Sequence, residues 1–423
     1  MRAEQRWTIV LLTLFGGLGS GCILNRPTYY QVSSKYTVRD PQFAQTIGTL
    51  LGPPLLSGNT IETLVNGDQI FPAMLATVRS AKKTITFETY IFWKGDVGKQ
   101  LTDALSERAR AGVKTHVLID WVGSNLIDPD YIKQMGAAGV DVRDYHAFHI
   151  YDPQTWMQVD HRTHRKILVI DGIIGFTGGA GIADEWRGKA DNAEHWRDNH
   201  YRVEGPVVGQ LQAAFCDNWM QTTGRVLEGD DYFPKIPPRG NQWGQMFRSS
   251  SSGGSENMEL LFLLSIAGAG QNIRMESAYF DPDSLTRHSL IEAKKRGVSI
   301  QIIVPGARID QTVVRAASRA HWGEMLQKGI EIYEFQPTMI HCKLLIVDDY
   351  WVSIGSSNMD DRSFRLNDEA NLNVMDGGFA AEQVRLFDQD LHRCRQITYK
   401  LWQKRSLGER IGDAFSTLFD SEI

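Results

Sequence analysis

The chain has 423 residues, of which 42% are hydrophobic and 22% are charged. This balance is typical of a globular protein with enough material for two or three modules, and it excludes a disordered or collagen-like chain. The 45 lysines and arginines stand against 50 aspartates and glutamates, which gives a formal net charge of -5. A duplex-DNA-binding protein normally carries a basic excess, so the composition argues against one, although a local basic cluster could still bind a phosphate. The four cysteines show no CxxC pair and no zinc-like spacing, which argues against a disulfide scaffold.

The first thirty residues have the layout of an export signal. Arg2 and Arg6 precede a short apolar run at 7–15, and small residues then lead to Cys22. The segment 18–22 is similar to a bacterial lipoprotein cleavage box, with its leucine one place further from the cysteine than in the commonest form. We therefore expect a lipidated Cys22 and an exported, membrane-associated lipoprotein of the cell envelope. An uncleaved membrane anchor and a fortuitous apolar tail are the alternatives.

Three segments of the first half of the chain recur in the same order in the second half. The matched pairs are residues 81–92 and 271–280, residues 111–120 and 296–305, and residues 138–145 and 328–335. In each half, a helical stretch ends at a glycine that is followed by a β-branched run, as where a helix leads into a strand. Strands that alternate with amphipathic helices predict α/β layers with a mostly parallel sheet. The chain is therefore predicted to be a duplication.

The duplication and the composition together predict the domain organisation. We expect a signal peptide or membrane anchor at 1–21, a membrane-proximal segment at 22–60, a first lobe at 61–222, a linker at 223–256, a second lobe at 257–405 and a helical tail at 406–423. The linker is inferred from a proline-rich stretch and a run of serines and glycines, a composition typical of an exposed connection.

Each half carries the same short motif soon after its third matched segment. The residues are His164, Lys166 and Asp171 in the first half, and His341, Lys343 and Asp348 in the second. Strand side chains alternate, so a histidine and a lysine two residues apart share one face. An imidazole can act there as a nucleophile or proton carrier while an ammonium group neutralises phosphate oxygens. One such pair is weak evidence, but two at identical spacing predict a phosphoryl-transfer site.

These motifs resemble the signature of the phospholipase D superfamily, HxKxxxxD followed by Gly-Ser-x-Asn, and in particular its bacterial cardiolipin synthase branch. The second copy has Ser356 and Asn358, followed by the run 358–371; the first copy has Gly179 and Gly181 in their place. The resemblance covers residues 60–405. It implies an α/β fold of two similar phospholipase D-like lobes, each a mostly parallel mixed sheet flanked by helices, with the active site at the lobe interface.

The resemblance also implies a mechanism. One histidine attacks phosphorus to form a phosphohistidine, while the other protonates the leaving alcohol and then deprotonates an incoming alcohol or water. We assign His164 as the nucleophile and His341 as the general acid and base, although the exchanged assignment stays open. Lys166 and Lys343 would hold the nonbridging oxygens. Because two lysines supply the charge, we expect no metal and no other cofactor.

Other polar residues are expected to support this catalytic set. Ser356 and Asn358 would add hydrogen bonds to the phosphate. A carboxylate should orient each imidazole and stabilise its charged form. The candidates by position are Asp198 for the first histidine and Glu369 for the second. The motif residues Asp171 and Asp348 are expected to fix the turn and the lobe contacts after each motif strand, and Cys342 is expected to lie in the core on the opposite strand face.

Two further segments have more than one interpretation. The first half is longer between its third matched segment and its motif, and the addition contains His146, Phe148, His149, Tyr151 and Trp156. It could lie at a lipid interface, shape the acceptor pocket or pack on its own lobe. A metal site formed by His146, His149 and His161 lacks a supporting carboxylate or cysteine pattern. The helical spacing of Leu407, Ile411, Phe415 and Leu418 favours a packing face over a membrane contact.

The favoured function is a membrane-associated phosphatidyltransferase of the cardiolipin synthase type, which transfers a phosphatidyl group from phosphatidylglycerol to a second phospholipid. A phospholipase D that hydrolyses phospholipid head groups is the first alternative. An exported nuclease is disfavoured by the acidic net charge, and a non-catalytic lipid-binding scaffold by the retention of both complete motifs. Phospholipids and a membrane are the expected partners, nucleic acid is not, and the sequence leaves the oligomeric state open.

Overall fold

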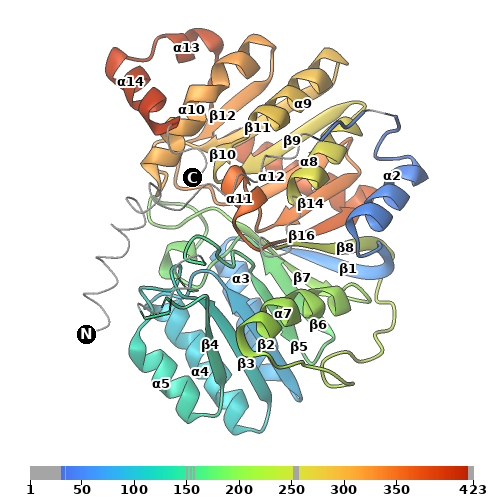
Figure 1. Ribbon diagram of the computed structural model, residues 1–423, viewed down its shortest axis with the longest axis vertical. Helices are drawn as coiled ribbons and strands as arrows, with labels where there is room; N and C mark the ends of the chain where they lie inside the picture. The colour runs from blue at the N-terminus through green and yellow to red at the C-terminus, as the bar shows by residue number, and fades with distance from the viewer. Residues whose placement is uncertain are drawn as a thin grey trace.

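The computed structural model describes residues 30–33, 35–148, 151–152, 155, 158–250 and 257–417. Within them, one 15-stranded sheet runs through two lobes of similar construction, which lie one above the other in Figure 1. The strand order is β17-β12-β11-β9-β13-β14-β16-β8-β1-β7-β6-β5-β2-β3-β4. The left half of this order belongs to the second lobe and the right half to the first, so the predicted two-lobed α/β architecture is confirmed.

The first lobe is built from residues 56–223. Its elements are β1 (Leu56–Val65), α3 (Gly67–Ser80), β2 (Thr84–Thr89), α4 (Asp96–Arg110), β3 (Lys114–Asp120), α5 (Pro129–Ala137), β4 (Asp141–Tyr145), β5 (Ile167–Ile170), β6 (Ile174–Gly178), the short 3-10 helix η3 (Asp184–Trp186), β7 (Asn199–Glu204) and α7 (Val208–Thr223). Strands β2, β3 and β4 are parallel, whereas β5, β6 and β7 continue the sheet in antiparallel order.

The second lobe repeats this plan. Its elements are α8 (Asn257–Ala267), β9 (Asn272–Ser277), β10 (Phe280–Asp281), α9 (Ser284–Lys295), β11 (Ser299–Pro305), α10 (Thr312–Gln327), β12 (Glu331–Phe335), β13 (Lys343–Val347), β14 (Trp351–Gly355), β15 (Met359–Asp360), α11 (Asp361–Arg365), β16 (Glu369–Met375), α12 (Gly377–Leu391), β17 (Cys394–Ile397), α13 (Tyr399–Gln403) and α14 (Leu407–Ser416). Strands β9, β11 and β12 are parallel, and β13, β14 and β16 are antiparallel. The prediction of a mostly parallel sheet in each lobe was therefore wrong. The parallel strands are a minority in both lobes, because the β-α-β pattern ends where the motif strand begins.

The range 223–256, predicted to be a linker, contains a strand. Strand β8 (Gln242–Ser249) pairs with β1 of the first lobe and β16 of the second. Met246 and Phe247 are fully buried within it. The prediction was wrong here because prolines before this strand and serines after it masked a short segment with buried apolar side chains. Only the proline-containing stretch at 226–241 forms the irregular connection.

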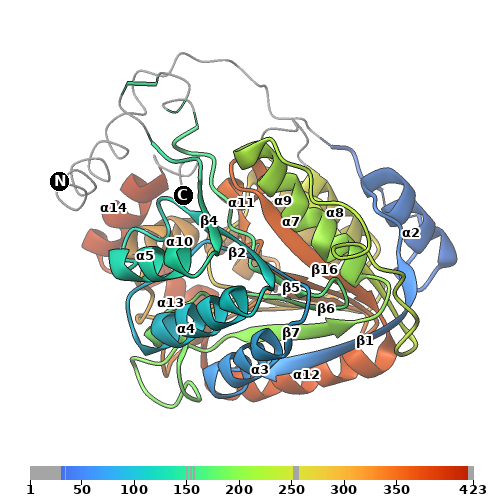
Figure 2. The same ribbon diagram turned by 90° about the horizontal axis from the view of Figure 1, so that it is seen from below.

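Local sequence explains how the helices begin and which face they bury. In α4, Val97, Leu101 and Leu105 recur every fourth residue and are buried, as in an amphipathic helix. Helix α5 starts at Pro129, and the side chain of Asp128 accepts a hydrogen bond from the first turn. Helices α3 and α12 lie on one side of the sheet in Figure 2, and α7 and α8 on the other. The sheet is thereby covered on both faces.

The N-terminal part of the described chain packs on the second lobe. Helix α2 (Pro41–Thr46) and the π-helical turn η2 (Ile47–Leu51) bury Phe43, Ile47 and Leu51 in the same core as β9 and β11. Strand β1 begins at Leu56, inside the predicted membrane-proximal segment. Cys22 and the predicted export signal lie outside the described residues. In the described chain, no helix combines the length and apolarity needed to cross a bilayer.

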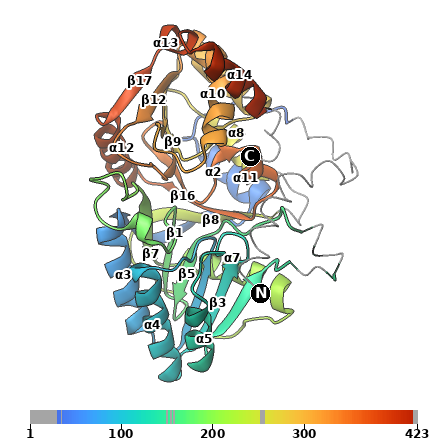
Figure 3. The same ribbon diagram turned by 90° about the vertical axis from the view of Figure 1, so that its left-hand side faces the viewer.

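The C-terminal region differs from the packing face predicted for it. Leu407, Ile411 and Phe415 are 71%, 61% and 62% exposed, and Leu418 lies outside the described residues. Helix α14 instead packs through its polar side, against α10. Figures 1 and 3 place α14 on the same side of the molecule as α10 and α11.

Candidate active site

The two HxK segments lie where the lobes meet, because each is paired with a segment of the other lobe. Thr163 forms a parallel bridge with Asp368, and Arg197 forms one with Ile340. The backbone N–H of His164 donates to the carbonyl of Asp368 at 2.9 Å. In the same way, the N–H of His341 donates to the carbonyl of Arg197 at 2.7 Å. Each motif histidine is therefore fixed in place by the opposite lobe.

The electrostatics of the motif residues show that both HxK pairs face one site. The charges of Lys166 and His164 contribute to the lowered pKa of His341, after burial and Lys343. Lys343 in turn acts on the pKa of both His164 and Lys166. All four side chains are almost fully buried, between 3% and 7% exposed. The predicted meeting of the two motifs at the lobe interface is thus what the structure has.

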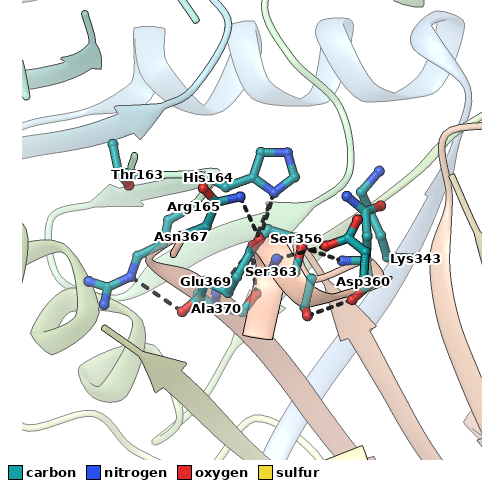
Figure 4. Close-up of polar contacts among 12 residues, drawn as sticks. Thr163, His164, Arg165, Lys343, Ser356, Asp360, Ser363, Asn367, Glu369 and Ala370 are labelled. Atoms are coloured by element: carbon teal, nitrogen blue, oxygen red, sulfur yellow. Dashed lines mark hydrogen bonds and ion pairs between the residues drawn. The ribbon is translucent and has the colours of Figure 1, made fainter. Parts of the chain in front are cut away.

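Glu369 orients His164, the histidine of the other lobe. Nδ1 of His164 lies 3.0 and 3.1 Å from the two carboxylate oxygens of Glu369, whose side chain is fully buried. Figure 4 shows the Glu369 carboxylate between this imidazole and the hydroxyl of Ser356, which donates to it at 2.5 Å. Burial alone would raise the pKa of Glu369, but His164, Lys166 and Ser356 together bring it below its usual value. Glu369 therefore stays ionised.

Asp198 makes the reciprocal contact with His341. Nδ1 of His341 lies 2.9 Å from Oδ2 of Asp198. The indole N–H of Trp186 donates to the same oxygen at 2.9 Å, and the backbone N–H of Asn199 donates to Oδ1 at 2.8 Å. The predicted pairing of Asp198 with His164, and of Glu369 with His341, is therefore wrong: the two partners are exchanged. The physical reason is that each carboxylate follows a segment that bridges to the opposite lobe.

The departure of the first motif from Gly-Ser-x-Asn has a structural cause. A Cβ added at Gly179, the position that corresponds to Ser356, would lie 2.3 Å from Oδ1 of Asp198. A serine cannot fit there. The indole of Trp186 supplies the hydrogen bond to Asp198 that the hydroxyl of Ser356 supplies to Glu369. The site is thus nearly symmetric in function although its residues differ.

Ser356 and Asn358 do not play the same part. The hydroxyl of Ser356 donates to Glu369 and accepts from the backbone N–H of Ala370, so its single hydrogen is already used. Its predicted hydrogen bond to the phosphate is therefore replaced by a bond that orients Glu369. Asn358 is buried, and its Oδ1 finds no hydrogen-bond partner within the described part of the chain. On the first lobe, a Cβ at Gly181 would clash with Ile91, which leaves no room for an equivalent side chain.

Burial sets the charge state of the lysines and histidines of the site. It lowers the pKa of Lys166 to about 7 and that of Lys343 to about 8. It also lowers the pKa of His164 to about 4. Both imidazoles are therefore neutral near pH 7, the form in which a histidine can attack phosphorus. An anionic phosphodiester would favour the protonated forms of its neighbours, since an opposite charge a few ångströms away favours the charged state.

Asp171 and Asp348 lie at the far end of their strands and do not touch the histidines. Asp171 accepts hydrogen bonds from the backbone N–H groups of Lys82, Lys83 and Thr84. Asp348 accepts from those of Gly270, Gln271 and Asn272. In both lobes, the motif aspartate thereby fixes the start of the neighbouring parallel strand. The expected structural part is in agreement with these contacts.

Two tyrosines, one beside each motif histidine, were missed by the sequence reasoning. The ring of Tyr90 lies edge-on to His164 at 5.3 Å, and Nζ of Lys166 is 5.7 Å from the centre of the same ring. Tyr279 lies 6.4 Å from the ring of His341, and its hydroxyl donates to Asp310 at 2.7 Å. Tyr90 is the first residue after β2 and Tyr279 the second after β9, so an aromatic residue close behind the first matched strand of each lobe was the signal that could have found them.

The remaining sequence predictions concern the flanks of the site. Cys342 is 2% exposed and lies in the hydrophobic core, as predicted. In the long first-lobe segment, Nδ1 of His146 lies 2.8 Å from the carbonyl oxygen of His161, whereas His149 and Trp156 lie outside the described residues. Among the described residues, no group of three or more histidines, cysteines and carboxylates is placed to hold a metal ion.

The site therefore combines two buried imidazoles, each backed by a carboxylate, with two ammonium groups. Imidazoles can act as nucleophiles or proton carriers, and ammonium groups can neutralise phosphate oxygens, so this set of groups is suited to phosphoryl transfer. A family model described as "Cardiolipin synthase, PLD-like domain" matches residues 74–215 and 263–391. Cardiolipin synthase A of Pseudomonas fluorescens is 34% identical over 375 residues, which cover 86% of this chain and 76% of the relative. Cardiolipin synthase of Geobacillus kaustophilus is 34% identical over 367 residues, with 86% and 72% covered.

The chain belongs to the cardiolipin synthase family of phospholipase D-like proteins. This confirms the predicted class, a phospholipase D-superfamily phosphatidyltransferase. Solved structures agree in fold: phosphatidylserine synthase of Haemophilus influenzae has a TM-score of 0.66 at 13% identity, with 90% of this chain and 99% of that chain covered. Polyphosphate kinase of Porphyromonas gingivalis has a TM-score of 0.53 at 12% identity, with 88% and 52% covered.

Proposed function

We propose that this enzyme makes cardiolipin by transferring the phosphatidyl group of one phosphatidylglycerol to a second phospholipid, through a phosphohistidine on His164. The observation that supports it most directly is the crossed arrangement of Glu369 with His164 and Asp198 with His341. Each imidazole has Nδ1 engaged by a carboxylate, so the opposite nitrogen, Nε2, is the one available for chemistry.

In the first half-reaction, His341 has taken up a proton on binding of the anionic phosphodiester, which favours the charged form of its neighbours. Nε2 of His164 attacks phosphorus while His341 gives this proton to the oxygen of the leaving glycerol. The phosphorus–oxygen bond to glycerol breaks as the phosphorus–nitrogen bond forms. Lys166 and Lys343 neutralise the nonbridging oxygens in the transition state. The ionised Glu369 stabilises the positive charge that His164 acquires on phosphorylation.

In the second half-reaction, His341 takes the proton of the acceptor hydroxyl, whose oxygen attacks phosphorus and releases His164. His341 has then regained the proton that it gave away, so the cycle closes without any net proton change in the enzyme. Water in place of the lipid hydroxyl would give phosphatidic acid instead, which makes exclusion of water the difference between transferase and hydrolase.

Two features support His164 over His341 as the nucleophile. Nε2 of His341 lies 3.0 Å from Nζ of Lys343, whereas no such contact to Nε2 of His164 occurs in the described part of the chain. In addition, burial raises the pKa of Asp198, while the pKa of Glu369 is lowered. The better ionised carboxylate thus stands behind His164, where a phosphohistidine would need it.

The experiment is to incubate the purified enzyme with phosphatidylglycerol in detergent micelles and to identify the products by mass spectrometry. Cardiolipin together with free glycerol is the expected result. Phosphatidic acid as the sole lipid product would make the enzyme a hydrolase. Turnover of nucleic acid without turnover of lipid would show that the substrate is a nucleic acid and not a phospholipid.

We further propose that the enzyme is a cell-envelope lipoprotein that is lipidated at Cys22. The support is the basic start, the short apolar run and the small residues before the cysteine. Labelled palmitate should be incorporated into the wild-type protein in bacterial cells and not into Cys22→Ser. Equal labelling of the two proteins would exclude lipidation at this cysteine.

A further inference from the structure

Helix α14 turns its polar side to the protein and its apolar side to solvent. Leu407 and Ile411 are 71% and 61% exposed, and Phe415 continues the same stripe at 62%. Residues four apart lie on one face of a helix, so the three side chains form a single exposed surface, called here the α14 face. On the other side, Asp413 and Ser416 are buried. An amphipathic helix of a globular domain normally has the reverse orientation.

This inverted orientation is fixed by ion pairs. Asp413 is 2% exposed and lies 2.5 Å from a guanidinium nitrogen of Arg319 in α10, and it also contacts Arg405. The helix starts with a capping box between Ser406 and Glu409. Separating the partners of a buried charge pair is strongly destabilising. Rotation of α14 to bury its apolar face would separate Asp413 from Arg319 and Arg405. The exposure of the α14 face is therefore built into the packing.

The surroundings of the α14 face are basic. Arg410 is exposed next to Ile411, and Lys400 and Lys404 are exposed in the segment that leads into α14. Glu409 is engaged in the helix cap and lies 3.7 Å from Arg319. A helix with an apolar face and a basic rim is the pattern of segments that lie in the interface of a bilayer. Each lysine or arginine near an anionic leaflet adds to the electrostatic attraction. Charge complementarity thus favours an anionic lipid surface as the occupant.

The α14 face also lies on the side of the molecule that carries the site. The C-terminal region lies along α10. Tyr399 contacts Gln327 at the end of α10, and Asp413 contacts Arg319 nearer its start. The C-terminal region therefore runs toward the start of α10 at Thr312. Just before that start, Asp310 accepts a hydrogen bond from Tyr279, whose ring lies beside His341. Figures 1 and 3 both place α14 and α10 with α11, which follows the Ser356–Asp360 segment of the site.

We infer that α14 docks on an anionic bilayer, with Leu407, Ile411 and Phe415 entering the boundary between head groups and acyl chains. The docking brings the end of the sheet at which the motif strands β5 and β13 begin toward the lipid surface that supplies the substrate. The inference rests on the proposed function, because a lipid substrate is what calls for a lipid surface. The protein then takes its substrate directly from the membrane and not from solution.

Hydrogen–deuterium exchange of the full-length protein tests the docking without any activity readout. Phosphatidylcholine vesicles with and without phosphatidylglycerol are added, and exchange is followed in peptides that cover 400–417. Slower exchange is expected with the anionic vesicles. In Ile411→Glu this protection should be lost, and in the matched control Val226→Glu, which changes a 64% exposed apolar residue elsewhere, it should remain. Unchanged exchange on addition of anionic vesicles would overturn the inference.

Two other occupants give distinguishable results. If a second copy of the chain covers the α14 face, protection appears without vesicles and rises with protein concentration. If residues of the same chain cover it, protection is present without vesicles at every concentration. Either result, combined with no further effect of vesicles, contradicts docking on lipid.

Activity separates this inference from the proposed function. Dihexanoyl phosphatidylglycerol below its critical micelle concentration is a substrate that needs no bilayer. Wild type and Ile411→Glu should turn it over equally, whereas on anionic vesicles Ile411→Glu should lose about tenfold or more in apparent affinity, as expected for removing one buried aliphatic side chain. No turnover of the soluble lipid by wild type would count against the proposed function. Equal activity of both proteins on vesicles would count against docking.

Discussion

Glu369 of the second lobe lies 3.0 Å from Nδ1 of His164 in the first lobe. Its counterpart Asp198 reaches in the opposite direction, to His341. Each catalytic imidazole is thus oriented by a carboxylate that is carried by the other lobe. Replacing Glu369 by Gln, or Asp198 by Asn, should lower kcat by about 10³-fold or more, since loss of the orienting carboxylate disfavours the required tautomer and the imidazolium. Cardiolipin formation measured by mass spectrometry checks this, with thermal unfolding as the control for folding.

A substrate whose leaving group needs no proton should distinguish the roles of the two histidines. With a phosphatidyl ester of p-nitrophenol, His341→Ala should still release one equivalent of nitrophenolate in a burst and retain phosphorus on His164. His164→Ala should show no burst. Both variants should fail to make cardiolipin from phosphatidylglycerol. A burst from His164→Ala and none from His341→Ala would reverse the assignment of the nucleophile.

Trp186 should act as a positioning residue for Asp198. Trp186→Phe keeps the aromatic packing but removes the N–H that lies 2.9 Å from Oδ2 of Asp198. We expect a drop in kcat of about tenfold, in line with the loss of one hydrogen bond to a charged group. Ser356→Ala, which removes the corresponding donor to Glu369, is the matched variant and should lose a similar factor. If Trp186→Phe changes only the melting temperature and not kcat, the tryptophan is merely structural.

The lysines predict the alkaline limit of activity. Because burial lowers the pKa of Lys166 to about 7 and of Lys343 to about 8, their charge is lost as the pH rises through this range. kcat/KM, which reports the free enzyme, should therefore fall as the pH rises above about 7, and further above about pH 8. Its acid limit should lie near the pKa of His164, about 4, because His164 must be unprotonated to attack phosphorus.

Lys343→Arg provides the control for this pH profile. A guanidinium group remains charged throughout the range, so the alkaline decline should move to higher pH even if the maximal rate is reduced. An unchanged decline would show that another group sets the alkaline limit.

The motif aspartates should contribute to stability and not to the chemical step. Asp171→Ala leaves the N–H groups of Lys82, Lys83 and Thr84 without their acceptor. Water can replace the acceptor at the exposed Lys82 and Lys83, but Thr84 is buried. Since one buried donor without a partner costs about 1–3 kcal/mol, we expect a loss of that size in the free energy of unfolding. Denaturant unfolding measures this loss. Asp349→Ala, at a 45% exposed surface ion pair, is the control and should change stability by less than about 1 kcal/mol.

The sequence was sufficient to predict the duplication and the pairing of histidine with lysine within each motif. These depend on short-range patterns: the alternation of strands and helices, and a spacing of two residues between His341 and Lys343 that brings Nζ to 3.0 Å from Nε2. The meeting of the two motifs was implied by the resemblance to the phospholipase D superfamily and not by these patterns. The exchange of carboxylates could not be predicted in this way. His164 and Glu369 are 205 positions apart, and their contact depends on how the segments before β5 and β16 bridge the lobes. Nothing within either half of the sequence encodes that choice.

Other features were hidden because a local pattern had a more common interpretation. Strand β8 is short and has prolines before it and serines after it, so composition favoured a linker. Trp186 follows two acidic residues and would ordinarily be assigned to the core, yet its N–H completes the Asp198 contact. The apolar spacing of Leu407 and Ile411 correctly indicated a helix face, but spacing alone does not say whether that face meets protein or solvent.

The exchange of carboxylates between the lobes means that neither half of the duplication is a working catalyst by itself. A single ancestral unit would have needed a second copy of itself to complete each histidine, and in such a homodimer both histidines would have been identical by symmetry. In one polypeptide the two centres need not be identical, and they are not. Asp198 receives a hydrogen bond from Trp186, beside the side-chain-free Gly179, whereas Glu369 receives one from Ser356, so a substitution on one side can tune one histidine without touching the other.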